Sequence, residues 1–197
     1  MIAMSVKSEL GKLQKKLNNI QKKQIPFATA KALTATAKHV QAEQATQVEK
    51  DFDKPTPFTK KGFYIKAATK GRLYSVVGIK DIQAKYLQLQ ITGGIRRPKR
   101  KALIAPVQQR RNRYGNIPKG RLKTLAAKTN TFSGTINGTA GMWERTKSGR
   151  LKLLVSYSDK QEYKKRYDFV GASRKMAQKR FPIELSRAIS QALRSAR

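Results

Sequence analysis

Cysteine is absent from this sequence, and histidine occurs once, as His39. Without cysteine the chain can form neither disulfides nor thiolate metal sites. No apolar run approaches the roughly 20 residues that a membrane-spanning helix needs. The first residues, MIAMSVKSELGK, also lack the continuous apolar stretch of a signal peptide. We therefore expect a soluble protein that makes no membrane contact and works in a reducing or disulfide-indifferent setting.

Acidic residues are scarce as well. The chain has 11 Asp and Glu against 44 Lys and Arg, for a formal net charge of +33, and no acid occurs between Asp81 and Glu144. Such an imbalance destabilises a compact monomer by self-repulsion, so a polyanion or an acidic protein is the expected partner. Nucleic acid is the commonest polyanion and is bound by neutralising its phosphates. The alternative is a solvated basic surface on an ordinary protein.

The groups that an enzyme would need are missing or scattered. His39 lies in a helical pattern among Ala, Lys and Gln, and the acids are not placed together as carboxylate catalysis requires. Asp51 and Asp53 form a D-x-D pair that could hold a divalent metal, but they more simply break a helix and cap a turn. The segment GTINGTAG lacks the Lys-Ser/Thr of a phosphate-binding loop. We predict a protein that is not an enzyme and uses no cofactor or metal.

Residues 1–50 show two helical patterns. Apolar residues spaced by three and four predict a first helix over residues 5–23, and this narrow stripe comprises Val6, Leu10, Leu13, Leu17 and Ile20. The stripe could dock on the chain's own next helix or pack against another subunit or a neighbouring protein. An Ala-rich second helix is predicted over residues 24–50, with Pro26 in its first turn.

The rest of the chain mixes strands and helices. Pro55 and Pro57 make residues 51–61 an extended connector. Residues 62–158 read as an antiparallel sheet region, with a hairpin turning at Lys70–Gly71, a short helix before Gly93–Gly94 and three later strands. Residues 159–197 are helical in character, with a break or kink near Pro182. We predict one α+β domain: a small twisted antiparallel sheet with an N-terminal helix pair and a C-terminal helix packed on it.

The most basic segment is residues 93–123, which hold eleven Lys or Arg and no acid. We expect it to be a long loop excursion from the sheet. Arginine suits bidentate phosphate contacts that ignore base sequence, and Tyr114 is the only aromatic residue, which argues against a base-stacking platform. The alternative is a loop that orders only against an acidic protein. The predicted contact residues are Arg96, Arg97, Lys99, Arg100, Lys101, Arg110, Arg111, Arg113, Lys119 and Arg121.

Several segments in order resemble a family of phage proteins. They are the Leu/Lys-patterned first helix, the Ala-rich IPFATAKALTATAKHVQAEQ, a Pro-rich joint with a hairpin, YLQLQITGG before the basic segment, and RFPIELSRAISQALRSAR at the end. This arrangement is similar to the minor tail protein Z family and related tail-completion or head–tail joining proteins of bacteriophages with long non-contractile tails. The resemblance covers most of the chain, although the basic segment is longer than in the minimal members of the group.

The resemblance implies a structural role and no catalytic residues. It implies a virion component at the head-proximal end of the tail, assembled in the host cytoplasm and present as a rotationally symmetric homo-oligomer. Its implied partners are the tail terminator, tail tube and connector proteins, and its basic surface would face the leading end of the DNA or acidic neighbours. The stripe from Val6 to Ile20 would then serve subunit or neighbour packing.

A second hypothesis is a sequence-nonspecific nucleic-acid-binding protein, either ribosomal or nucleoid-associated. Composition does not separate it from the tail protein, because both need Lys and Arg. Ribosomal proteins often carry long basic tails with little apolar periodicity. Here sheet and helix patterns bracket the basic segment, which favours the tail protein.

Overall fold

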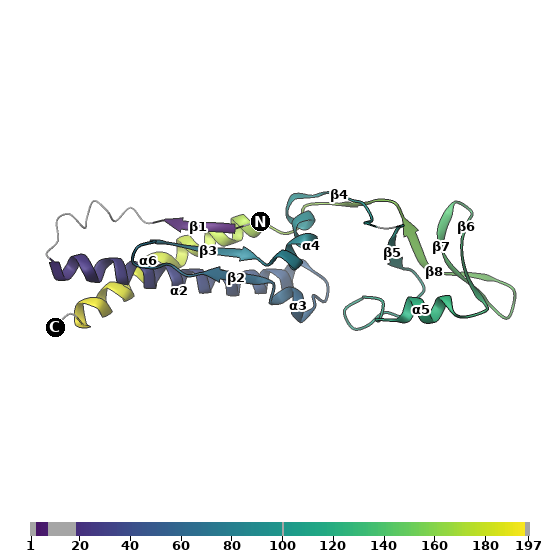
Figure 1. Cartoon of the computed structure of the whole chain (residues 1–197), viewed down its shortest axis with the longest axis horizontal. Coiled ribbons are helices and arrows are strands. Elements are labelled where there is room, and N and C mark those ends of the chain that lie inside the picture. Colours follow the sequence, from purple (N-terminus) through teal and green to yellow (C-terminus); the bar gives the residue numbers. More distant parts are fainter. Residues whose placement is uncertain (1–2, 8–18, 100, 196–197) are drawn as a thin grey trace. The chain divides into compact units, whose positions relative to one another are not determined.

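A computed structural model describes residues 3–7, 19–99 and 101–195. The described chain forms two compact units (Figure 1). Unit 1 comprises residues up to Ile91 together with those from Lys165 onward, and unit 2 comprises Thr92–Lys164. Unit 2 is thus an insertion into unit 1, which the chain leaves after Ile91 and rejoins at Lys165. No helix among the described residues is long and apolar enough to span a bilayer.

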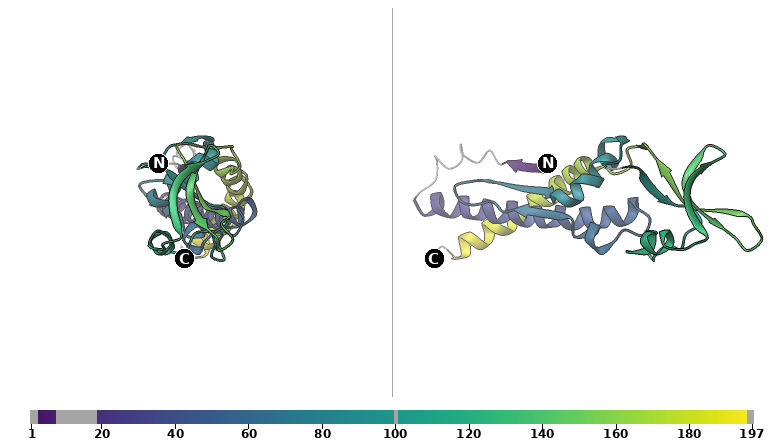
Figure 2. Two further views of the ribbon diagram at one scale, coloured as in Figure 1. Left: turned by 90° about the vertical axis from the view of Figure 1, so that its right-hand side faces the viewer. Right: turned by 45° about the vertical axis from the view of Figure 1, so that its right-hand side comes forward.

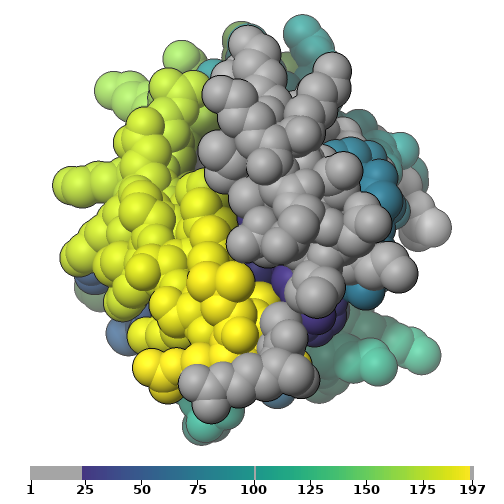
Figure 3. All heavy atoms as spheres, turned by 90° about the vertical axis from the view of Figure 1, so that its left-hand side faces the viewer, coloured from purple at the N-terminus to yellow at the C-terminus, as the bar shows by residue number. Residues whose placement is uncertain are grey.

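Two long helices, α2 (Asn19–Asp51) and α6 (Phe169–Ser195), pack along each other in unit 1. Small side chains allow this close approach: Ala28 and Ala32 of α2 meet Ala188 and Ala192 of α6 in one buried cluster. On the face shown in Figure 3, α6 (yellow-green to yellow) forms a large part of the surface. The Ala-rich composition of α2 therefore serves helix–helix packing as well as helix propensity.

The helices cover a three-stranded antiparallel sheet of order β1-β3-β2, where β1 is Ala3–Lys7, β2 is Phe63–Lys66 and β3 is Tyr74–Ile79. Most of β3 is buried, including its last three residues. Val77 packs against Ala37 and Val40 of α2 and Ala177 of α6. Figure 1 shows both helices on the same side of this sheet. One face of the sheet is therefore part of the core that the helices close.

Two short helices complete unit 1. In α3 (Pro57–Lys60), Thr56 is the N-cap and its side chain accepts a hydrogen bond from the Thr59 amide at 3.3 Å. The longer α4 (Asp81–Thr92) buries Leu87 and Ile91 in the main core cluster, together with Val48, Phe63, Ile79, Tyr167 and Phe169. The core is thus built from both chain segments of unit 1.

Unit 2 begins and ends with a strand pair, β4 (Gly94–Arg96) against β9 (Gln161–Tyr163). A four-stranded antiparallel sheet follows, with order β5-β8-β7-β6. Its strands are β5 (Leu103–Pro106), β6 (Thr131–Ile136), β7 (Thr139–Arg145) and β8 (Leu151–Ser158). The short helix α5 (Arg121–Ala126) contributes Leu125 to a small core with Met142, Leu154 and Val155. Figure 2 shows how strongly β6, β7 and β8 curve.

The α+β class is confirmed, but the N-terminal helix pair is not found in the described residues. Residues 5–7, predicted as the start of a helix, belong to the edge strand β1, and Val6 lies opposite Ser75 of β3. A single helix, α2, then begins at Asn19 and continues through Pro26. Val6 and Ile20 therefore do not share one helical stripe, and Leu10, Leu13 and Leu17 lie outside the described residues. Pairing with β3 gives Val6 its strand conformation. The predicted stripe of five apolar residues was too short to determine the conformation at this position.

Three further predictions need correction. Residues 93–123 do not form a loop excursion, since they contain β4, β5 and the start of α5. The strands form three sheets, where one was predicted. At the C-terminal end, residues 161–163 are strand, and α6 begins at Phe169 and runs unbroken through Pro182. A proline removes one backbone donor, which the packing of α6 on α2 tolerates.

Candidate functional site

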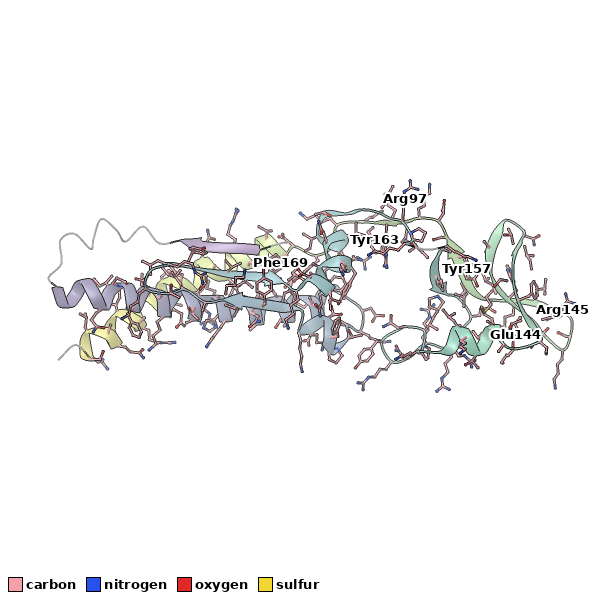
Figure 4. The ribbon with its side chains drawn as sticks, viewed as in Figure 1. Arg97, Glu144, Arg145, Tyr157, Tyr163 and Phe169 are labelled. Carbon is pink, nitrogen blue, oxygen red and sulfur yellow. The ribbon has the colours of Figure 1, made fainter. Side chains whose placement is uncertain are left out.

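The first basic cluster lies around β4. Arg96 ends the strand opposite Gln161 of β9, and Arg97, Lys99 and Lys101 follow it. All four side chains are exposed, and Arg97 points away from the β4–β9 pair (Figure 4). Arg100 lies outside the described residues. This cluster is an exposed, positively charged surface.

The second basic cluster surrounds a cavity of about 450 Å³. We call it the arginine cavity; its lining residues are Arg110, Arg111, Asn112, Arg113, Pro118 and Arg121. Three of the arginines come from the loop after β5, and Arg121 opens α5. The fold therefore gathers four of the ten predicted contact residues around one space. Lys119 is exposed on the same loop and does not line the cavity.

Hydrogen bonds within the loop hold the arginine cavity in shape. The Asn112 side-chain oxygen accepts from the amides of Tyr114 at 2.9 Å and Asn116 at 3.0 Å. The main chains of Asn112 and Asn116 are joined by a further bond of 2.8 Å. Gly115, at φ +77°, supplies the left-handed turn that this closure requires. Asn112 thus acts as the hub of a folded loop.

Two arginine side chains of the cavity are fixed by neutral partners. Arg111 donates from Nη2 to the Pro106 carbonyl at 2.8 Å. The buried Gln109 side-chain oxygen accepts from Arg121 Nε and from the Arg110 amide, each at 2.9 Å. The guanidinium of Arg113 lies 4.7 Å from the centre of the Tyr114 ring. None of these partners is negatively charged, so the positive charge of the cavity stays uncompensated.

The whole of unit 2 shares this imbalance. It contains eighteen Lys and Arg against three acids, a net charge of +15. Among the described residues, every ion pair lies in unit 1, where they involve Glu49 and Glu184. Glu144 on β7 accepts a hydrogen bond from Asn130, a neutral residue. Arg145 beside it is exposed (Figure 4). The arrangement can attract and hold an anion.

In the described part of unit 1, a cavity of about 560 Å³ has Lys31, Lys38 and Lys70 in a lining that is otherwise alanine, threonine and one phenylalanine, with no arginine. His39 Nε2 lies 3.2 Å from the buried carboxylate of Glu184, which Arg187 also contacts at 3.2 Å. The single histidine therefore links α2 to α6. No group of three or more His, Asp or Glu side chains converges in the described part of the chain. Asp51 is the last residue of α2.

Sequence reasoning named the arginines of the cavity but missed Gln109 and Asn112. Gln109 gives no signal in the sequence, because a glutamine next to basic residues is expected on the surface. Asn112 and Asn116 do flank a Tyr-Gly turn, the kind of pattern in which an asparagine side chain folds back on the main chain. This pattern predicts a turn, but it does not predict that the turn lines a cavity.

Comparison with known proteins decides the family. A sequence model of the family described as prophage minor tail protein Z (GPZ) matches residues 10–197, nearly the whole chain. The chain belongs to the prophage minor tail protein Z family. Searches of curated proteins and of solved structures give no match.

Membership of the minor tail protein Z family settles the general role. The chain is a structural component of a bacteriophage tail and not an enzyme. It is part of the virion, and its partners include other tail proteins. The predicted resemblance to this family is confirmed. The arginine cavity is therefore to be understood as part of a tail structure.

Proposed function

We propose that this minor tail protein Z completes the tail at its head-proximal end and takes part in joining tail to head. The observation that carries the proposal is the unneutralised basic surface of unit 2, with its +15 charge and its cavity of four arginines. A tail protein with such a surface needs an anionic neighbour. At the head-proximal end, both the leading end of the DNA and acidic faces of neighbouring proteins supply one.

The proposed neighbours are the tail terminator, the tail tube and the connector. We further propose a homo-oligomer with rotational symmetry, because a ring presents the same basic surface to a central DNA or to a symmetric partner from every subunit. A ring multiplies the charge of each subunit by the copy number, so its assembly should depend on salt and on the anionic partner. Leu10, Leu13 and Leu17 are the proposed contacts to neighbours, together with Val6 and Ile20.

The alternative, a ribosomal or nucleoid-associated protein, explains the positive charge but not the match to the minor tail protein Z family. A tail protein accounts for both.

Deletion of the gene from an inducible phage, with complementation from a plasmid, tests the proposed function. Without the protein we expect complete tails and DNA-filled heads that accumulate separately, and joined infectious particles when the plasmid supplies it. Arrest before any tail tube forms would place the protein earlier in assembly and contradict the proposal. Joined particles of normal infectivity without the protein would contradict it too.

A further inference from the structure

We propose that the arginine cavity is a preformed site for one phosphodiester group of the DNA backbone. This inference rests on the proposed function, since it specifies the anion that unit 2 contacts. It also separates the basic residues of unit 2 into two kinds. Arg110, Arg111, Arg113 and Arg121 line the cavity, whereas the cluster around β4 gives only general attraction.

The first argument is electrostatic. A guanidinium stays charged at any pH the protein meets, so four of them around about 450 Å³ repel one another permanently. The described residues provide no ion pair to any of the four. An arrangement of this kind is stabilised when an anion enters, and a single oxyanion can contact several of the guanidinium groups at once.

The second argument is that neutral contacts fix the arginines and leave their donors available. A guanidinium has five N–H donors. Arg111 gives one bond to the Pro106 carbonyl, and Arg121 gives its Nε–H to Gln109, so most of their donors remain for a ligand. The guanidinium carbon of Arg113 lies 4.7 Å from the centre of the Tyr114 ring, a cation–π contact that occupies no N–H donor in a hydrogen bond.

The third argument concerns Gln109, which is only 7% exposed in an otherwise highly solvated loop. Burying an amide costs free energy unless its hydrogen bonds are made. Gln109 uses its oxygen on Arg121 and on the Arg110 main chain, joining the two ends of the loop that carries the cavity. Gln109 is therefore a positioning residue, which sets the separation of the arginines before any ligand binds.

The choice of a phosphodiester follows from the arginine donors of the cavity and from its lack of an aromatic lining residue. A carboxylate accepts hydrogen bonds mainly in its own plane, whereas the two non-bridging oxygens of a phosphodiester accept them from a wider range of directions. This range suits donors from four side chains that line one cavity. No aromatic residue lines the cavity, so a base has nothing to stack on and the contact reads no sequence. The flanking phosphates of the same strand would meet exposed cations such as Lys119.

The test uses the purified full-length chain and a fluorescently labelled 20-base-pair DNA duplex, with anisotropy measured at several NaCl concentrations. Arg111→Lys with Arg121→Lys keeps every charge but removes the forked donors. Arg145→Lys with Arg150→Lys is the matched control, since both arginines are exposed in unit 2 around the β7–β8 turn. Thermal melts of all variants establish that each is folded.

We expect the cavity variant to bind the duplex about tenfold more weakly, because bidentate arginine contacts become single lysine contacts. The control should stay within about twofold of the unmodified chain. In Arg111→Gln with Arg121→Gln, the slope of log Kd against log salt should fall by about two, one for each lost phosphate contact.

Equal weakening in the cavity and control variants would overturn the proposal, because charge alone would then explain binding. It would also fail if the unmodified chain ignored the duplex at low salt but bound poly-glutamate through the same arginines, which would assign the cavity to an acidic protein. The deletion experiment does not depend on these measurements. Separate heads and tails in that experiment, with no effect of Arg→Lys here, would leave the tail role standing and reject the cavity alone.

Discussion

The hydroxyl of Tyr167 donates a hydrogen bond to the side-chain oxygen of Gln44 at 2.5 Å, and both side chains are fully buried. Tyr167 lies where the chain returns from unit 2, while Gln44 lies in the C-terminal third of α2. The Gln44 amide continues the network to Ser173 Oγ at 2.9 Å and the Phe169 carbonyl at 3.2 Å. The main-chain amides of Arg166 and Tyr167 both donate to the Gln90 carbonyl, next to the point where the chain departs. The two ends of the insertion are thus fixed in one core.

Tyr167→Phe should destabilise unit 1 by about 1–3 kcal/mol, because the Gln44 oxygen loses its donor in a site that water does not reach. Urea unfolding followed by far-ultraviolet circular dichroism measures this. Tyr74→Phe is the matched control, since Tyr74 is 37% exposed, and it should change stability by less than about 0.5 kcal/mol. Equal effects of the two substitutions would contradict the role given to the network.

Stability should also fall at high pH through Tyr167. Burial, with a smaller contribution from the Asp51 carboxylate, raises the pKa of Tyr167 far above its usual value near 10. A tyrosine in the unfolded chain loses its proton near pH 10, whereas the folded chain keeps it, so the stability present below pH 10 is lost as pH rises above it. Relative to Tyr167→Phe, the unmodified chain should lose about 1.4 kcal/mol per pH unit above pH 10. Parallel curves for the two proteins between pH 9 and 11 would refute this.

Substitution by alanine should affect the stability of unit 2 differently at two glycines of the same sheet. A Cβ on Gly141 would lie 2.4 Å from the Val155 carbonyl oxygen, a backbone atom of the neighbouring strand. Gly141→Ala should therefore destabilise unit 2 by about 1–3 kcal/mol. A Cβ on Gly134 would meet only the Phe132 ring, at 3.8 Å, so Gly134→Ala should be neutral or slightly stabilising. Fluorescence of Trp143, the single tryptophan, reports on unit 2 directly; similar midpoints for both variants would contradict the close approach.

The buried carboxylate of Glu184 should destabilise unit 1 when its two partners, His39 and Arg187, are removed. His39→Ala with Arg187→Ala leaves a carboxylate that is only 7% exposed without either partner, and we expect a loss of about 1–3 kcal/mol because both partners are partly solvated. Adding Glu184→Gln to this pair should recover part of the loss. Thermal denaturation of the three proteins measures it, and a further loss in the triple variant would show that the charge of Glu184 is not the cause.

Local patterns predicted much of this fold. The hairpin turning at Lys70–Gly71, the helix before Gly93 and the strands over 131–158 all depend on turn residues and apolar alternation within a few positions. Val6 shows where such patterns fail, because its conformation is decided by pairing with Ser75, nearly seventy residues away. Pro26 was predicted in the first turn of a helix and Pro182 near a helix break or kink, but both lie within continuous helices.

The candidate site was predictable in its charges and not in its shape. The clusters of lysine and arginine in the sequence identified all four arginines of the cavity, because charged residue types are read directly from the sequence. Which of them converge depends on the hydrogen bonds of Gln109 and Asn112. Those bonds form only when the loop closes, so composition could not separate the cavity from the cluster around Arg97.

The central claim, that this minor tail protein Z sits where the tail meets the head, is tested most directly by immunogold labelling of intact particles. Purified phage carrying the gene would be labelled with an antibody against unit 2 and viewed by electron microscopy, with particles from the deletion strain as the control. We predict gold at a single position, the junction between head and tail. Gold along the tail tube or at the distal tip would contradict the account.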